Sequence, residues 1–311
     1  MQKVGIIGGS GFIGSHITKK FLEENYTVRV SATDLSNKEK YQHLRNFASS
    51  GNLELFQLNT QNDNELKEFV NGCNILVHCG TPFQLDVADV QKDLLDPTIK
   101  GTENFLKVVS GSPQVKKVVV VASVAAINPS FPFPAAENLP NHLYAETDVP
   151  VVNEMTHPYS QAKYYADQVV RNYIRDNPAL DTEIISVFPT FVVGNQLSDR
   201  KDSTSAGMQF LIKNKLSPNP FMEAVFQYDI TFAMVDVRDV AEGIFRAATV
   251  PGLHGRNYLF TSESWAVSDI SLMLNNEAPQ GKSKMVYSNK KATTELGIEF
   301  NPPQVALNEF I

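Results

Sequence analysis

Three glycines near the start of the chain constrain its fold more than any other feature of the sequence. They are spaced as Gly8-Gly-Ser-Gly11-Phe-Ile-Gly14, after an apolar β-type run, Lys3–Ile7, and at the start of a helical pattern, Gly11–Glu24. A helix that starts this way leaves backbone N–H groups unpaired, and its dipole adds positive potential there. A pyrophosphate can bind at that point when no side chain blocks its approach. The loop predicts a dinucleotide site made of Gly8, Ser10, Gly11, Phe12, Ile13 and Gly14.

The first half of the chain alternates strand and helix patterns. The expected strands are short, apolar and rich in Val, Ile or Leu: Lys3–Ile7, Thr27–Ala32, Leu53–Leu58, Ile75–His78, Lys117–Ala122 and Glu183–Phe188. The expected helices between them are Gly11–Glu24, Asn64–Val70, Asp86–Val109 and Ser160–Asp176. Near-continuous apolar strands are typical of a parallel sheet covered on both faces. The alternation therefore predicts an α/β fold with a doubly wound parallel sheet.

The pattern loosens after Pro189. Helical stretches are expected at Ser205–Asn214 and Asp236–Ala248, with Asp236 as the N-cap, and short strands at Ile230–Val235 and Asn257–Thr261. Residues 1–190 are expected to form the dinucleotide-binding domain. Residues 191–311 should form mostly a smaller substrate-binding lobe over the carboxyl ends of the strands, with some segments returning to the first domain.

A proline-rich segment, Asn128–Pro158, interrupts this organisation. Proline lacks the N–H donor that helices and central strands need, so the segment should be a long irregular excursion. It is too apolar for disorder, because it carries Phe131, Phe133 and Tyr144. A wall facing the substrate and an ordinary surface loop both remain open.

Composition excludes several classes of protein. The net charge is −7, from 27 basic and 34 acidic residues, and no basic patch suited to nucleic acid appears. The two cysteines, Cys73 and Cys79, are expected to be free thiols, and no ligand pattern points to a metal. No signal peptide or membrane span is recognised, so we expect a cytoplasmic protein with a small-molecule partner.

A tyrosine and a lysine, Tyr159 and Lys163, are spaced to share one helix face. A phenol has a pKa of about 10, which a neighbouring cation lowers, so Tyr159 is suited to protonate an alkoxide. Ser123 ends an expected strand and so should face the cleft where ligands bind in such sheets. Its hydroxyl could hold a substrate oxygen. Ser123, Tyr159 and Lys163 are therefore the candidate catalytic residues.

The GxxGxxG spacing and the YxxxK pair resemble those of the extended branch of the short-chain dehydrogenase/reductase superfamily. Further segments resemble its dihydroflavonol-reductase-like group of aldehyde and ketone reductases: His78–Pro82, Asp96–Thr102, Ile185–Gly194, Val235–Ala241 and Lys290–Gly297. The resemblance implies a Rossmann fold. It also implies that Tyr159 and Lys163 contact the cofactor, together with Gly80, Thr81, Pro82, Pro189 and Val192. His78 is expected to be a buried histidine with satisfied hydrogen bonds rather than a catalytic one.

The sequence departs from that group in three places. Thr33 stands where many reductases have an arginine for the cofactor's 2′-phosphate, Ala122 stands where a second Ser or Thr is common, and Asn195 replaces a usual proline. Separately, Thr98 stands where sugar-nucleotide members often have asparagine, which weighs against a nucleotide-sugar enzyme. The NWYCYGK signature of plant cinnamoyl-CoA reductases is absent, which argues against that substrate.

The end of the second strand bears on the choice of cofactor. Asp34 lies about 20 residues past Gly14, the position of an NAD-selecting acid in the general fingerprint. Alignment to the family instead places Ala32 there, and Thr33 with Lys40 could hold a 2′-phosphate. We expect NADP to be preferred to NAD, with Thr33, Asp34 and Lys40 at the site.

Together these features predict an NAD(P)-dependent oxidoreductase that reduces a small or medium aldehyde or ketone. Two alternatives remain open: a sugar-nucleotide epimerase or dehydratase that keeps its NAD bound, and a catalytically silent NAD(P)-binding regulator. The resemblance allows a monomer or a homodimer.

Overall fold

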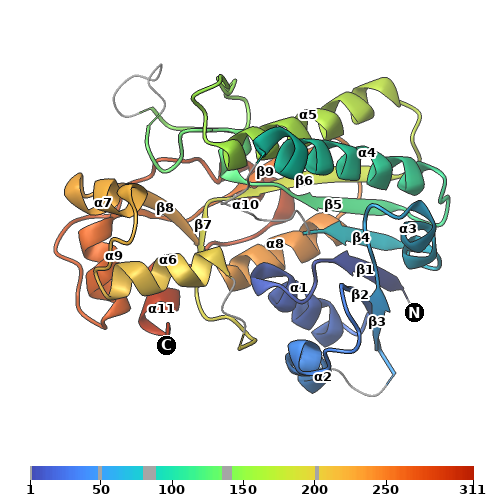
Figure 1. Ribbon diagram of the computed structural model, residues 1–311, viewed down its shortest axis with the longest axis horizontal. Coiled ribbons are helices and arrows are strands. Elements are labelled where there is room, and N and C mark those ends of the chain that lie inside the picture. The colour runs from blue at the N-terminus through green and yellow to red at the C-terminus, as the bar shows by residue number, and fades with distance from the viewer. Residues whose placement is uncertain (1, 48–50, 80–88, 135–141, 200–202) are drawn as a thin grey trace.

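A computed structural model describes residues 2–47, 51–79, 89–134, 142–199 and 203–311. Its main feature is a parallel sheet of seven strands in the order β3-β2-β1-β4-β5-β6-β9 (Figure 1). The strands are β1 (Lys3–Ile7), β2 (Thr27–Ala32), β3 (Leu53–Gln57), β4 (Ile75–His78), β5 (Lys117–Val121), β6 (Glu183–Pro189) and β9 (Asn257–Phe260). The order reverses between β1 and β4, which is the crevice where doubly wound sheets bind dinucleotides.

Helices cover both faces of this sheet (Figure 1). One face packs against α1 (Phe12–Glu23), α2 (Gln42–Phe47), α8 (Val237–Thr249) and α10 (Lys290–Leu296). The other packs against α3 (Asp63–Val70), α4 (Asp96–Ser110) and α5 (Pro158–Asp176). Because both faces are covered, the strands are apolar on both sides, as their near-continuous Val and Ile runs predicted.

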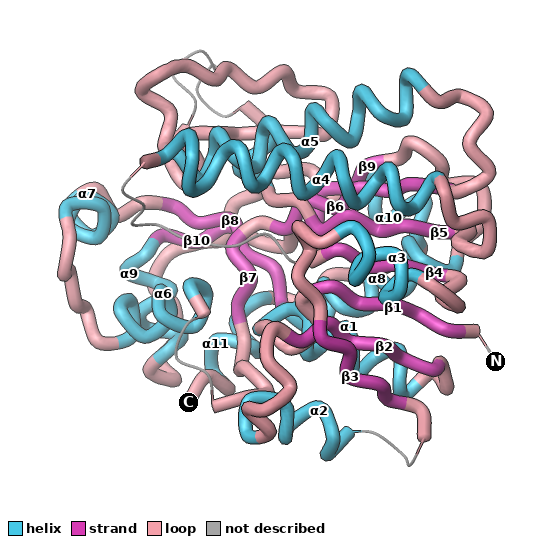
Figure 2. Tube along the Cα trace, turned by 45° about the vertical axis from the view of Figure 1, so that its right-hand side comes forward, coloured by secondary structure: helices cyan, strands magenta, loops and turns pink. Residues whose placement is uncertain are grey.

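A second sheet has the strand order β10-β8-β7 and supports the lobe after β6. Its strands are β7 (Phe191–Val193), β8 (Thr231–Asp236) and β10 (Ser264–Ala266). Its apolar core includes residues of α6 (Thr204–Lys213), α7 (Pro220–Gln227), α9 (Val267–Leu274) and α11 (Pro303–Asn308). Figures 1 and 2 show this lobe on the side of the large sheet opposite the N-terminus, where the parallel strands end.

The expected strands and helices agree with the structure to within one or two residues at most ends. Asp236 caps α8 as expected, since its side chain accepts a hydrogen bond from the Arg238 N–H. The helix expected over Asp86–Val109 differs. Its residues 86–88 lie outside the described residues, and a π-helical turn, η2 (Gln91–Leu95), precedes α4. Within the described ranges there are also two 3₁₀ turns: η1 (Glu39–Tyr41) and η3 (Val124–Ala126).

Part of the proline-rich excursion packs as core rather than as an open wall. Tyr144 is buried and stacks on Tyr287 with ring centroids 4.8 Å apart. Phe131 lies edge-on to Phe232 and Tyr287, at 6.2 and 6.0 Å. Phe133 instead contacts Phe221 of α7, which is 42% exposed. Phe133 is therefore better placed than Phe131 to face a ligand.

No helix within the described ranges combines the length and the apolar character needed to cross a lipid bilayer.

Candidate active site

The glycine loop connects β1 to α1 with very little space around it. A Cβ atom on Gly14 would lie 2.1 Å from the Gly8 carbonyl oxygen and 2.8 Å from the Gly9 Cα. Gly8 has a φ of 79°, and its N–H donates to Ser31 Oγ at 2.9 Å. Gly14 therefore lets the start of α1 lie directly against the Gly8–Gly9 turn.

The start of α1 is suited to an anion. Its N-cap is Gly11, and no side chain caps the helix there. The first-turn N–H groups are thus not satisfied by a capping side chain, and the helix dipole is positive at this end. Ser10 is buried, while Phe12 and Ile13 are partly buried. This donor set fits the pyrophosphate of a dinucleotide.

The residues after β2 form a small polar group on the surface. Lys40 donates from Nζ to Thr33 Oγ1 at 2.9 Å. Asp34 accepts hydrogen bonds at one carboxylate oxygen from the Ser36 N–H and hydroxyl, at 2.9 and 2.7 Å. These bonds keep the pKa of Asp34 below its ordinary value. The Asp34 carboxylate thus accepts hydrogen bonds from a residue of its own loop. Beside it, Lys40 provides an ammonium group and Thr33 a hydroxyl that could bind an anion.

Ser123 and Tyr159 meet at the carboxyl edge of the sheet. Ser123 follows β5, and its Oγ accepts a hydrogen bond from the Ala125 N–H at 3.2 Å. Tyr159 is the second residue of α5, whose N-cap, His157, accepts a hydrogen bond at Nδ1 from the Tyr159 N–H. A hydrogen bond between the Ser123 and Tyr159 side chains favours the phenolate. A hydroxyl has a single proton to donate, so Ser123 holds a substrate carbonyl oxygen only when that proton turns from the Tyr159 oxygen to the substrate.

Lys163 lies one turn further along α5. Its Nζ is 5.7 Å from the centroid of the Tyr159 ring. Desolvation lowers the pKa of Lys163 to about 8, opposed by the nearby Cys79 thiol. The ammonium therefore carries its charge at neutral pH and loses it as the pH rises through about 8.

The pKa of Tyr159 is not lowered in this structure, contrary to what the sequence had led us to expect. The sequence predicted a lowered phenol pKa, but burial raises the pKa of Tyr159, and Ser123 is the group that opposes the rise. The physical reason is burial, because removing the phenolate from water costs more than the hydrogen bond with Ser123 returns.

For the remaining residues expected to contact the cofactor, the structure gives a position at most, and three of them lie outside the described residues. Gly80, Thr81 and Pro82 lie outside the described residues. Pro189 ends β6 at the same carboxyl edge as Ser123. Val192 is buried in the core shared with α8, so only its backbone is available to a cofactor.

Two features of the site were not expected from the sequence. His78, at the end of β4, lines a small cavity that Lys163 also lines, rather than being enclosed in the core. Asp167 is 4% exposed on α5, and its Oδ2 accepts a hydrogen bond from Arg171 Nε. Its position four residues after Lys163 on the same helix was a signal that it could lie near the site.

Comparison with known proteins matches residues 4–259 to the model of the NAD dependent epimerase/dehydratase family. A cinnamoyl-CoA reductase of Medicago truncatula is 26% identical over 98% of this chain and 93% of its own length. An anthocyanidin reductase of Vitis vinifera is 24% identical over 93% of this chain and 88% of its own. The fold is similar to that of the yeast methylglyoxal/isovaleraldehyde reductase Gre2 complexed with NADPH, with a TM-score of 0.82, 22% identity and coverage of 99% and 97%.

Proposed function

The chain belongs to the NAD dependent epimerase/dehydratase family, and from this premise we propose that it is an NAD(P)-dependent reductase. Its reaction transfers hydride to the carbonyl carbon of a small or medium aldehyde or ketone. The relatives reported above are named as reductases, and one fold neighbour was solved with NADPH. The observation that carries the proposal is the Ser123–Tyr159 hydrogen bond with Lys163 one turn away.

The chemistry of these side chains suits carbonyl reduction. A bound nicotinamide dinucleotide supplies the hydride. Tyr159 donates its phenolic proton to the carbonyl oxygen as that oxygen gains negative charge, so the product is an alcohol. Ser123 holds the same oxygen through its hydroxyl. Lys163 carries a positive charge beside the phenol at neutral pH and stabilises the phenolate left after proton transfer.

We propose NADPH as the preferred cofactor. Lys40 and Thr33 would hold its 2′-phosphate with a charge-assisted bond and a hydroxyl donor. The carboxylate of Asp34 accepts two hydrogen bonds from Ser36 at one oxygen, and its negative charge lies near Lys40, which must outweigh the repulsion between Asp34 and the phosphate. An acid free to bind the ribose 2′-hydroxyl would instead favour NADH.

The lobe after β6 supplies the substrate side of the site in this proposal. Phe133 and Phe221 offer an apolar surface there, which suits an aliphatic or aromatic carbonyl compound rather than a sugar nucleotide. We also assign the protein to the cytoplasm, in line with two cysteines that remain free thiols.

The test is an assay of NADPH oxidation with a panel of aldehydes and ketones, using the parent and Tyr159→Phe. The proposal expects turnover by the parent and a loss of at least about 10²-fold in the variant, with cofactor affinity nearly unchanged. Matched titrations with NADPH measure that affinity. A parent that oxidises no NADPH but retains a tightly bound cofactor would favour the epimerase. A parent that binds and releases cofactor without any turnover would favour the regulator.

A further inference from the structure

A hydrogen bond joins the helix of the glycine loop to the turn that follows β7. His16 lies on α1, two residues after Gly14, and its Nε2 is 2.9 Å from the backbone oxygen of Asn195. A carbonyl can only accept, so Nε2 carries the proton of this contact. Burial lowers the pKa of His16 below its ordinary value, so the ring is mainly neutral at pH 7 and this N–H is its single donor.

The two segments that this bond joins both belong to the cofactor site proposed above. The His16 ring lies edge-on to the ring of Phe12, the first residue of α1, with centroids 6.1 Å apart. The Gly194–Asn195 turn directly follows β7, where the backbone of Val192 is expected to contact the cofactor. The bond therefore connects the pyrophosphate end of the site to the end of β7, across 179 positions of the chain.

The turn is also held by two other parts of the substrate lobe. Gln209 of α6 is fully buried, and its side-chain amide accepts from the Gly194 N–H at 2.9 Å and donates to the Gly194 carbonyl at 3.2 Å. The side chain of Asn195 donates to the Glu309 carbonyl at 2.5 Å and accepts from the Ile311 N–H at 3.1 Å. Both residues of the turn are therefore fixed by hydrogen bonds.

This turn is one of the places where the sequence departs from the reductases that it resembles. Asn195 stands where they usually have proline. The proline ring carries no polar atom, so it makes neither of the two hydrogen bonds of the Asn195 side chain. In this chain, the segment after α11 is thus attached to the turn through a side chain that the usual residue does not provide.

We propose that His16 and Asn195 are positioning residues for the cofactor. Their contact sets the distance between the glycine loop and the end of β7, so a dinucleotide meets both segments already in place. The contact does not touch the ligand, but it removes the cost of ordering two separate segments when the ligand binds. The inference rests on the proposed function, because it takes the two ends of the cofactor site from there.

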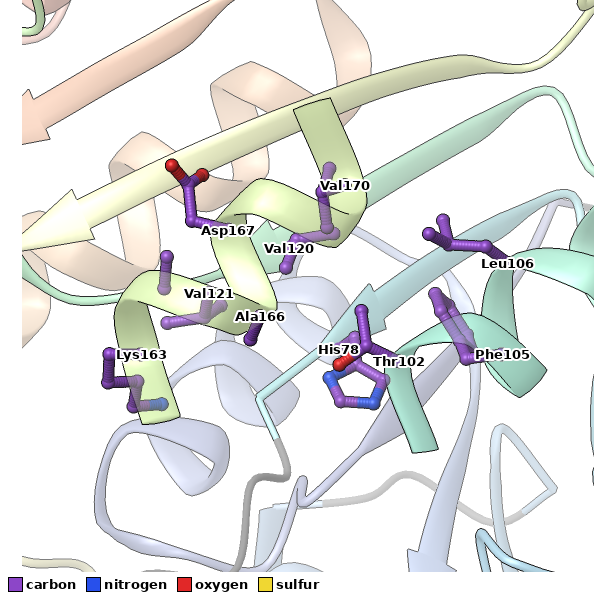
Figure 3. A pocket seen from close by; sticks show the side chains of 11 residues that line it. His78, Thr102, Phe105, Leu106, Val120, Val121, Lys163, Ala166, Asp167 and Val170 are labelled. Carbon is purple, nitrogen blue, oxygen red and sulfur yellow. The ribbon is translucent and has the colours of Figure 1, made fainter. Parts of the chain in front are cut away.

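The contact lies apart from the candidate catalytic residues. Lys163 is on α5, which packs on the other face of the large sheet, beside the small cavity that His78 and Thr102 also line (Figure 3). Neither His16 nor Asn195 is among the residues that line this cavity. A change at either residue should therefore alter cofactor binding without touching the proton donor or its lysine.

The test is calorimetric titration of the parent and four variants with NADPH and with 2′,5′-ADP. The second ligand carries the adenosine half of NADPH with its 2′-phosphate and does not extend to β7. His16→Leu removes the donor, whereas His16→Gln keeps an N–H at the same number of bonds from the backbone. Asn195→Ala removes both side-chain bonds of the turn. Lys20→Met is the matched control on α1, because it removes an ion pair with Glu242 of α8 and leaves the turn untouched.

The inference expects the Kd for NADPH to rise roughly fivefold in His16→Leu and in Asn195→Ala, which is the value of one ordinary hydrogen bond. The Kd for NADPH should stay parental in His16→Gln and Lys20→Met, and the Kd for 2′,5′-ADP should stay parental in every variant. If His16→Leu does not fold, Asn195→Ala decides the question.

Three results would overturn the inference. The first is a parental Kd for NADPH in the folded His16→Leu and Asn195→Ala proteins. The second is an equal loss of affinity for both ligands, which is the effect of a merely structural contact. The third is the same rise for NADPH in Lys20→Met. Failure of the proposed function is separate, since it would appear as a parent that binds NADPH but oxidises it with no carbonyl compound.

Discussion

Two single substitutions in the glycine loop should affect different properties of the protein. Gly11→Ala should weaken cofactor binding, whereas Gly14→Ala should lower the stability of the fold. At Gly14 the added Cβ would meet backbone, 2.1 Å from the Gly8 carbonyl oxygen and 2.8 Å from the Gly9 Cα. At Gly11 its nearest atom is the same oxygen at 3.3 Å, and the φ of −75° suits any residue. The first substitution requires the turn to move, whereas the second requires an adjustment of a few tenths of an ångström.

These contacts give different expected magnitudes. Overpacking typically costs about 1–3 kcal/mol, and a clash with backbone is near the upper end, while the helix propensity of alanine recovers about 1 kcal/mol. Gly14→Ala should therefore lose about 2 kcal/mol, or roughly 3 °C in Tm for a chain of 311 residues. Gly11→Ala should keep its Tm to within about 1 °C. Its methyl group lies where the pyrophosphate approaches, so the Kd for NADPH should rise at least about tenfold, or 1.4 kcal/mol.

Thermal melting and calorimetric titration with NADPH measure the two effects on the same samples. The reasoning about the anion site is refuted if Gly11→Ala is folded and binds NADPH as the parent does. The reasoning about the backbone contact is refuted if Gly14→Ala melts at the parental temperature.

Three further predictions concern the cofactor, the lysine and the substrate wall. Lys40→Gln should lower kcat/KM for NADPH by about tenfold and leave NADH unchanged. The reason is that an ammonium about 4 Å from a phosphate of charge −1.5 to −2 contributes about 1 kcal/mol per unit charge in water. An unchanged ratio of kcat/KM for NADPH to kcat/KM for NADH would refute this. The reductive kcat should fall as the pH rises through about 8, where Lys163 loses its proton; a rate that stays flat to pH 10 would contradict it. Phe133→Ala should alter the ranking of carbonyl substrates, whereas Phe131→Ala, in contact with Phe232 and Tyr287, should mainly lower the Tm; the reverse pattern would contradict this placement.

The sequence predicted the elements whose pattern repeats over many residues. The strands of the large sheet up to Pro189 are confirmed. They could be predicted because each is a continuous apolar run between turn signals. Elements such as β7 and β10 are three residues long and carry no period of their own, so tertiary packing defines them. Helix α7 did have a local signal, since Asn219 is its N-cap and Pro220 its first residue.

The candidate site shows the same division. The phosphate loop and the Tyr159–Lys163 pair are local motifs, so their chemistry could be inferred from spacing alone. The cavity with His78 and Thr102 combines residues from β4 and α4 that are distant in the sequence. Its size depends on how the neighbouring apolar side chains pack, which no motif records. Likewise, the partly buried position of Phe131 follows from contacts with β8 and the segment near Tyr287.

The central claim is that this site moves a hydride from the cofactor to a carbonyl while Tyr159 supplies the proton. Its most direct test is a turnover with NADPH that carries deuterium at the transferred position, followed by mass spectrometry of the alcohol formed. We predict one deuterium on the former carbonyl carbon in the parent and, in Tyr159→Phe, product formation slower by at least about 10²-fold. Unlabelled product, or a Tyr159→Phe rate within tenfold of the parent, would contradict the claim.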